Sequence, residues 1–121
     1  MFEYSKAFSG FAVDDVASAR RFYGTTLQLP VTQTPGRLRL ELSPQTHVLV
    51  YEKTGHAPAA YTVLNFPVQN VQEAVDELSG RGVVFERLGE TDGDGIFRRA
   101  GTAMAWFRDP SGNILSILEQ D

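Results

Sequence analysis

Apolar and polar positions along the chain follow the same pattern twice, 55 residues apart. Positions 11–19 read FAVDDVASA and positions 66–74 read FPVQNVQEA, with Phe, Val, Val and Ala in the same register. Phe11 and Val13 alternate with other residues, which is the two-residue period of a half-buried strand. From Val16 onward the apolar residues recur with helical spacing. Each phrase is therefore predicted to be a strand that turns into a helix.

Both predicted helices carry start and stop signals. Asp15 and Asn70 precede the helical stretches, where a side-chain oxygen can accept a hydrogen bond from a backbone N–H group. Glu73, three residues after Asn70, resembles the second member of a capping box. Gly24 is expected to end the first helix, and the glycines of segment 80–82 the second.

Strand candidates follow each predicted helix. After the first helix they are 30–34, 37–42 and 47–52, and after the second they are 83–88, 96–99, 102–107 and 113–119. SPQT (43–46) and DPSG (109–112) are turn sequences at comparable places in the two halves. We therefore expect a single α+β domain of two βαβββ modules, about residues 1–54 and 60–121. The modules are predicted to form a curved mixed sheet around a cleft.

Composition and charge narrow the class of partner. The 121 residues are 42% hydrophobic and 21% charged, which is typical of a globular protein. The net charge of −4 and the scattered Lys and Arg residues argue against a nucleic-acid partner. Cysteine is absent from the sequence, which excludes disulfides and thiolate metal sites. Without a signal-peptide pattern or a long apolar run, a cytoplasmic protein with no membrane contact is expected.

Three stretches carry a family likeness that spans essentially the whole chain. They are F-x-V-x-D-V…FYG (11–24), its echo at 66–74, and WFRDPSGNILSILEQ (106–120). Together they resemble the vicinal oxygen chelate superfamily, which includes glyoxalases, bleomycin-resistance proteins and extradiol dioxygenases. The resemblance implies the paired-module fold but no single activity, because this fold hosts many activities.

The resemblance also implies four metal-ligand positions, on the first and last strands of each module. In enzymes of the family, His, Gln and Glu residues there hold a divalent metal that chelates two vicinal oxygens of the substrate. The corresponding positions here are Phe8, Val63, Ser116 and either Leu49 or Val50. None is a competent ligand, so the metal site is expected to be absent and no cofactor is predicted.

Other residues are not expected to rebuild a metal site. His47 and Glu52 lie five residues apart on one predicted strand, so their side chains point to opposite faces. His56, in a segment with Gly, Ala and Pro, is interpreted as a surface residue. TDGDG (91–95) begins like a calcium loop but lacks its later Gly and Glu, and is predicted to be a turn.

Residues that share a face with the implied metal positions are predicted to line the cleft. The ligand-binding set is Phe8, His47, Leu49, Tyr51, Val63, Asn65, Met104, Trp106 and Ser116. Trp106 belongs to it because, in related proteins, the residue three before the DP aspartate contacts ligand, although a core role for this Trp is also open. An apolar, aromatic wall with a few polar groups is typical of a small-molecule pocket.

Two arginines leave a choice open. Arg37 and Arg39 alternate with Leu38 and Leu40, so both arginines share one face of their strand. Either they face solvent, which is favoured, or they bind an anion at the mouth of the cleft.

The favoured function is metal-independent binding or sequestration of a small organic compound, aromatic or amphipathic, as in the bleomycin-resistance branch. The alternative is a glyoxalase-like lyase or isomerase, or a dioxygenase, and it requires a divalent metal. His47 could serve as a base in a metal-free variant, but no acid partner is found and no catalytic residue is assigned. An interaction module is a third possibility. The resemblance implies a homodimer in every case, with pairing of modules within a chain or across the dimer left open.

Overall fold

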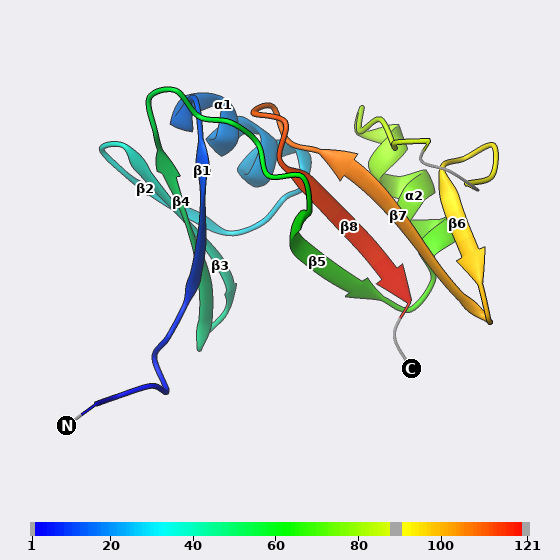
Figure 1. The fold of residues 1–121 in the computed structure, drawn as a ribbon, viewed down its shortest axis with the longest axis horizontal. Helices are drawn as coiled ribbons and strands as arrows, with labels where there is room; N and C mark the ends of the chain where they lie inside the picture. The colour runs from blue at the N-terminus through cyan, green and yellow to red at the C-terminus, as the bar shows by residue number, and fades with distance from the viewer. Residues whose placement is uncertain (1, 88–90, 120–121) are drawn as a thin grey trace. The chain divides into compact units, whose positions relative to one another are not determined.

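Two four-stranded mixed sheets, one in each half of the chain, form the framework of the protein (Figure 1). The computed structural model describes residues 2–87 and 91–119, and the chain divides into two compact units, Met1–Ala57 and Pro58–Asp121. The first unit contains β1 (Ser9–Val13), α1 (Val16–Arg20), the π-helix η1 (Arg21–Thr26), β2 (Val31–Thr34), β3 (Arg37–Ser43) and β4 (Thr46–Glu52). The second contains β5 (Thr62–Val68), α2 (Val71–Gly80), β6 (Ile96–Arg99), β7 (Thr102–Arg108) and β8 (Ile114–Glu119).

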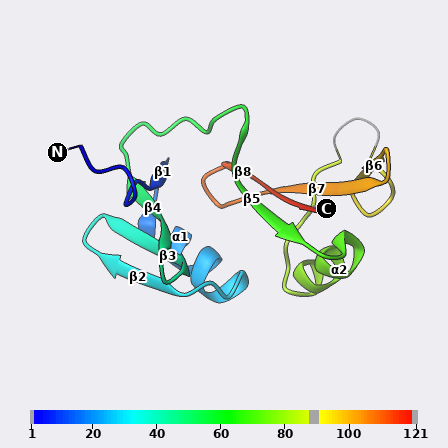
Figure 2. The ribbon, with the colours of Figure 1, turned by 90° about the horizontal axis from the view of Figure 1, so that it is seen from below.

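The two sheets have the same topology. Their strand orders are β1-β4-β3-β2 and β5-β8-β7-β6. In each sheet the first strand pairs in parallel with the last, and the remaining pairs are antiparallel. The helix that follows the first strand packs on one face of its own sheet (Figure 2). Each unit is thus a βαβββ module, which confirms the predicted α+β fold, while the shared cleft stays a prediction.

Buried apolar side chains lie on the helix side of each sheet. In the first unit, Leu38, Leu40 and Val50 are fully buried, and the buried Tyr23 ring lies 6.0 Å from the ring of Phe11. The buried apolar residues of the elements in the second unit are Val71, Val75, Ile96, Ala103, Ala105, Phe107, Leu115 and Ile117. Burying one large apolar side chain stabilises the fold by roughly 1.5–3 kcal/mol. Each core therefore uses one face of its sheet and leaves the opposite face without a helix.

The predicted helix starts are confirmed. The Asp15 carboxylate accepts a hydrogen bond from the Ala17 N–H at 3.1 Å, and the Asn70 side-chain oxygen accepts one from the Glu73 N–H at 2.9 Å. These oxygens satisfy backbone donors that have no partner within the helix. In the described part of the chain, no helix is long and apolar enough to span a membrane.

A glutamate at the end of each sheet's last strand binds the start of that unit's helix. Glu52 of β4 accepts a hydrogen bond from the Val16 N–H at 3.1 Å. Glu119 of β8 accepts one from the Val71 N–H at 2.9 Å. A carboxylate is favourable here because the N-terminal end of a helix carries partial positive charge. The sequence repeat therefore extends to a tertiary contact that links the helix to the last strand of its own sheet.

The expected end of the first helix is wrong. Gly24 lies inside η1, where the Leu27 N–H donates to the Phe22 carbonyl five residues back at 2.9 Å. Gln28, with φ of 61°, takes the left-handed position after the helix that glycine usually occupies. A Cβ at Gly24 would lie 3.1 Å from Val31 Cγ2, so this glycine allows close packing and does not end the helix.

The predicted strand at 83–88 is also wrong over residues 83–87, and residue 88 lies outside the described residues. Here Phe85 forms only an isolated bridge to Phe107, and the Glu86 N–H donates to the Trp106 carbonyl at 2.7 Å. The reason is that β6 pairs with residues 102–105 of β7. Only a short length of that edge therefore remains for residues 83–87.

The segment TDGDG is a turn, as predicted. One carboxylate oxygen of Asp92 accepts hydrogen bonds from the Ile96 N–H at 3.0 Å and the Asp94 N–H at 2.8 Å. These two hydrogen bonds, the one from Ile96 first, hold the pKa of Asp92 below its usual value. The charged carboxylate therefore contributes to the stability of the turn.

We expect Glu119→Ala to lower the free energy of unfolding by about 1 kcal/mol, because the Val71 N–H loses its acceptor. Glu52→Ala should behave in the same way. Glu119→Gln keeps an acceptor oxygen without the charge, so its loss should be smaller. Urea unfolding followed by circular dichroism measures the series. Equal stability of wild type and both Ala variants would show that these contacts do not stabilise the modules.

The lowered pKa of Asp92 predicts how acid acts on the turn. Its contribution should be complete above about pH 5 and should disappear as the pH falls through the lowered pKa. The stability difference between wild type and Asp92→Ala should therefore shrink on acidification. Asp92→Asn, which keeps an acceptor but does not titrate, should not show this loss. Denaturant unfolding at several pH values tests it, and a pH-independent difference for Asp92→Ala would contradict it.

Candidate ligand-binding faces of the two sheets

The face of the first sheet opposite α1 brings together four of the predicted ligand-binding residues. His47, Leu49 and Tyr51 alternate along β4 with the buried Val48 and Val50. Phe8, just before β1, lies with its ring 4.5 Å from the imidazole of His47. We call this surface the first helix-free face; its members are Phe8, Gly10, Ala12, Thr32, Thr34, Arg37, Arg39, Glu41, His47, Leu49 and Tyr51.

Small residues of β1 leave the β4 side chains uncovered on one side. Gly10 is paired with Leu49, and Ala12 with Tyr51. A Cβ at Gly10 would lie 2.9 Å from the Leu49 carbonyl oxygen, so only glycine allows the two strands to approach this closely. Tyr51 is 40% exposed, which is unusual for a large aromatic side chain in the middle of a sheet. This surface therefore offers exposed aromatic area beside small residues.

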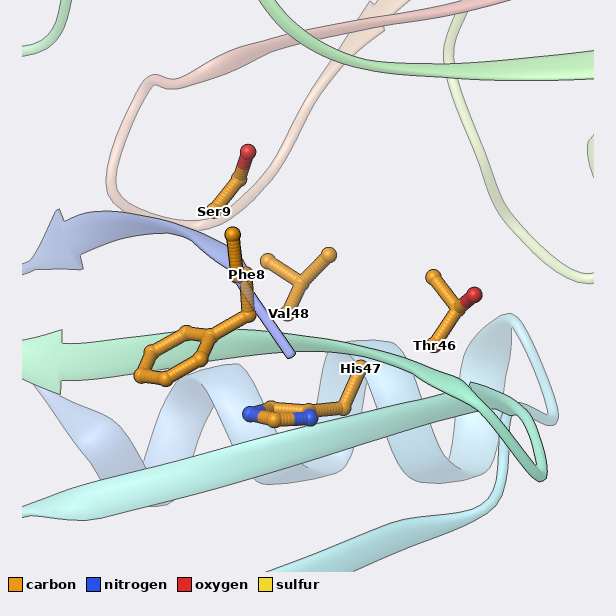
Figure 3. Close-up of a pocket in the computed structure, with 6 residues that line it drawn as sticks. Phe8, Ser9, Thr46, His47 and Val48 are labelled. Carbon is orange, nitrogen blue, oxygen red and sulfur yellow. The ribbon is translucent and has the colours of Figure 1, made fainter. Parts of the chain in front are cut away.

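A shallow pocket lies at the beginning of β1 and β4, where Phe8 and His47 of this face meet residues from the other side of the sheet. It has a volume of about 270 Å³ and is lined by Ala7, Phe8, Ser9, Thr46, His47 and Val48. Figure 3 shows the rings of Phe8 and His47 together on one side and the hydroxyls of Ser9 and Thr46 on the other. The volume is close to the lower limit of about 300 Å³ for ligand pockets, so it suits one small ring.

The structure places both arginines of β3 on the first helix-free face. Arg37 is paired with Tyr51, and Arg39 with Leu49. Arg39 also forms an ion pair with Glu41 at 3.0 Å. The two arginines are solvent-exposed, as favoured from the sequence, and they also share their face with predicted ligand-binding residues.

The helix-free face of the second sheet carries the other predicted polar and aromatic residues. Asn65, Ser116 and Trp106 form one row across β5, β8 and β7. The Ser116 hydroxyl, which is fully buried, donates to the Asn65 side-chain oxygen at 2.5 Å. Ser116 therefore orients the exposed Asn65 and is itself covered. We call this surface the second helix-free face; its members are Asn65, Pro67, Phe97, Arg99, Thr102, Met104, Trp106, Arg108, Ile114, Ser116 and Leu118.

Trp106 is half-buried and has an aromatic neighbour that the sequence analysis missed. Phe97 of β6 lies with its ring 6.1 Å from the indole and is paired with Met104 of β7. The alternation of Phe97 with the buried Ile96 was the signal that could have found it. Trp106, Phe97 and Met104 therefore form an apolar patch on the second helix-free face.

Val63 has a less regular position than its neighbours. The pairing of β5 with β8 shifts between Thr62 and Leu64, so that Thr62 is paired with Ile114 and Leu64 with Leu115. Val63 is the extra residue of this irregularity, and it is half-buried. Its orientation is therefore not set by the regular alternation that places Asn65.

Strand register decides which residue of β4 corresponds to Ser116. Counting back three residues from Glu52 and Glu119, which make equivalent helix contacts, gives Leu49 and Ser116. Val50 is fully buried on the helix side and is excluded. Among residues 2–87 and 91–119, no three His, Asp or Glu side chains gather closely enough to hold a metal ion. His56, interpreted as a surface residue, is in fact half-buried.

The comparisons with known proteins define the family. Residues 7–117 match the family model described as the Glyoxalase/Bleomycin resistance protein/Dioxygenase superfamily. The chain therefore belongs to this superfamily, which confirms the resemblance seen in the sequence. No curated protein matches the chain.

Several solved structures share the fold at low identity. TnmS3, an antibiotic binding protein from Streptomyces sp. CB03234, is 20% identical with a TM-score of 0.71, covering 95% of this chain and 96% of that one. The fosfomycin resistance protein FosX from Listeria monocytogenes is 12% identical with a TM-score of 0.74, covering 100% and 96%. Oxidase ChaP-H2 is 23% identical with a TM-score of 0.67, covering 95% and 94%. The TM-scores establish a shared fold, and the different names illustrate how many activities it hosts.

Proposed function

We propose that this protein binds a small aromatic or amphipathic compound on its helix-free sheet faces and does not transform it. One observation carries the proposal: the positions that hold metal ligands in enzymes of the family are here Phe8, Leu49, Val63 and Ser116. Three of these side chains have no atom that can bind a metal, and the fourth, Ser116, offers only a neutral hydroxyl, which donates a hydrogen bond to Asn65. These residues do not fit a divalent metal, and we derive no catalytic step through one.

Aromatic area on both helix-free faces supports the proposal. Phe8 is 56% exposed although its ring lies against His47, and Trp106 is half-buried beside Phe97. A flat guest that stacks on such rings gains about 0.5–1.5 kcal/mol per aromatic pair beyond the burial of apolar area. The Tyr51 hydroxyl and the Asn65 amide offer polar groups that can orient the guest.

The shared fold with TnmS3 is consistent with a binding role, since that protein is described as an antibiotic binding protein. The competing function is a metal-dependent lyase, isomerase or dioxygenase. It is considered because one protein of the same fold, oxidase ChaP-H2, is named as an enzyme. The two functions differ in their need for a metal ion, and this difference can be measured directly.

Protein purified without an affinity tag should contain far less than one equivalent of Ni, Zn, Mn or Fe per chain. The reason is that the four implied ligand positions lack the nitrogen and carboxylate donors that these ions require. Elemental mass spectrometry of the purified protein, with the dialysis buffer as control, gives the answer. One tightly bound equivalent would overturn the proposal and favour the metal-dependent enzyme.

Trp106→Ala should weaken the binding of a neutral planar aromatic compound such as 2-naphthol by about tenfold or more, because the guest loses its stacking surface. Trp106→Phe should retain part of the affinity. Val84→Ser changes an apolar side chain that is 79% exposed and lies outside both helix-free faces, so it serves as the matched control. Calorimetric titration measures all four proteins.

The only tryptophan of the chain gives an independent readout, since quenching of its fluorescence by 2-naphthol would place the guest near Trp106. Thermal unfolding of each variant shows how much folding is affected. If Trp106→Ala loses stability and affinity to the same extent, the indole is a core residue and not a binding surface.

A further inference from the structure

The first helix-free face carries a positive charge that no acidic side chain among residues 2–87 and 91–119 neutralises. Within these described residues, the ion pairs are Arg39 with Glu41 on this face, and Arg81 with Glu77, Arg98 with Asp92 and Arg108 with Glu86 in the second unit. Arg37 is exposed and belongs to none of them. On a chain of net charge −4, an arginine outside these ion pairs and beside an exposed aromatic ring is available to contact an anionic ligand.

Strand register sets the neighbours of Arg37. It is paired with Tyr51 on β4 and with Thr34 on β2, and Tyr51 is paired with Ala12 on β1. Directly opposite residues have Cβ atoms about 4.5–5.5 Å apart, so their polar groups can reach the same atoms of a guest. The row therefore combines a guanidinium and two hydroxyls with the ring of Tyr51.

The internal repeat shows that the fold does not require this arginine. Tyr51 and Leu118 each precede the glutamate that binds the helix start, so they are equivalent. The residue paired with Leu118 is Met104, which therefore corresponds to Arg37. Where one module has a cation beside a phenol, the other has two apolar side chains. The two helix-free faces thus differ in chemistry at an equivalent position.

We propose that Arg37 and Tyr51 form a recognition pair for the carboxylate of an aromatic acid; this rests on the proposed function and names its ligand class. A planar guanidinium donates two parallel hydrogen bonds to a carboxylate, and the Tyr51 hydroxyl can donate a further one. A single negative charge matches Arg37, because the other described arginine of this face, Arg39, is already paired with Glu41. The Tyr51 ring, which is 40% exposed beside the small side chain of Ala12, supplies apolar contact for the aromatic part of the acid.

Calorimetric titration with 2-naphthoate and its uncharged methyl ester tests this proposal. Wild type should bind 2-naphthoate about tenfold more tightly than the ester, since a charge-assisted hydrogen bond is worth about that much. Arg37→Gln should abolish this preference and leave the affinity for the ester unchanged. Arg37→Lys should retain part of it, because the charge stays but the two-pronged geometry is lost. Tyr51→Phe should weaken the binding of 2-naphthoate by a few fold.

Arg20→Gln is the matched control, because Arg20 is an exposed arginine of α1 and its loss changes the net charge equally. This control should bind both compounds as wild type does. Equal affinity of wild type for 2-naphthoate and the ester, no binding of 2-naphthoate, or equal losses in Arg20→Gln and Arg37→Gln would each overturn the proposal. If 2-naphthol still binds and its binding depends on Trp106, the general binding function stands while the assignment of Arg37 fails.

Discussion

The contact between the last strand and the helix start is the constraint on which each module depends. Glu52 and Glu119 hold the first N–H groups of α1 and α2, and the strands that carry them pair in parallel with β1 and β5. The helix is therefore tied at its N-terminus to the centre of its own sheet. With the helix on one face, the apolar core forms there, and the other face keeps its side chains for contacts outside the module.

The same scaffold supports two chemically different surfaces. The first helix-free face carries Arg37 and Tyr51, whereas the equivalent positions of the second carry Met104 and Leu118. The residues at the four implied metal positions also support binding without a metal. Three of them have apolar side chains, and the fourth, Ser116, has a hydroxyl that donates to Asn65.

Local signals explain which expectations succeeded. The caps at Asp15 and Asn70 and the strand at 96–99 were predictable because each depends on residues close together in the chain. The prediction that Gly24 ends the helix is wrong because this glycine allows close contact with Val31, while Gln28 adopts the left-handed conformation. Segment 83–87 has a strand-like composition, but most of the β7 edge that it could join is already paired with β6.

The sequence by itself determined the duplication and the order of the elements apart from the strand expected at 83–88, because these are properties of residue type and spacing; it also fixed which residues occupy the metal positions that the resemblance implies. Tertiary structure alone decided that Leu49, and not Val50, corresponds to Ser116, that Ser116 is bonded to Asn65, and that Arg37 is paired with Tyr51. Each of these facts depends on strand register. Register is set by the hydrophobic pattern together with turn geometry and bulges, and the shift between Glu41 and Ser43 in the β3–β4 pairing is a feature that residue type and spacing did not reveal.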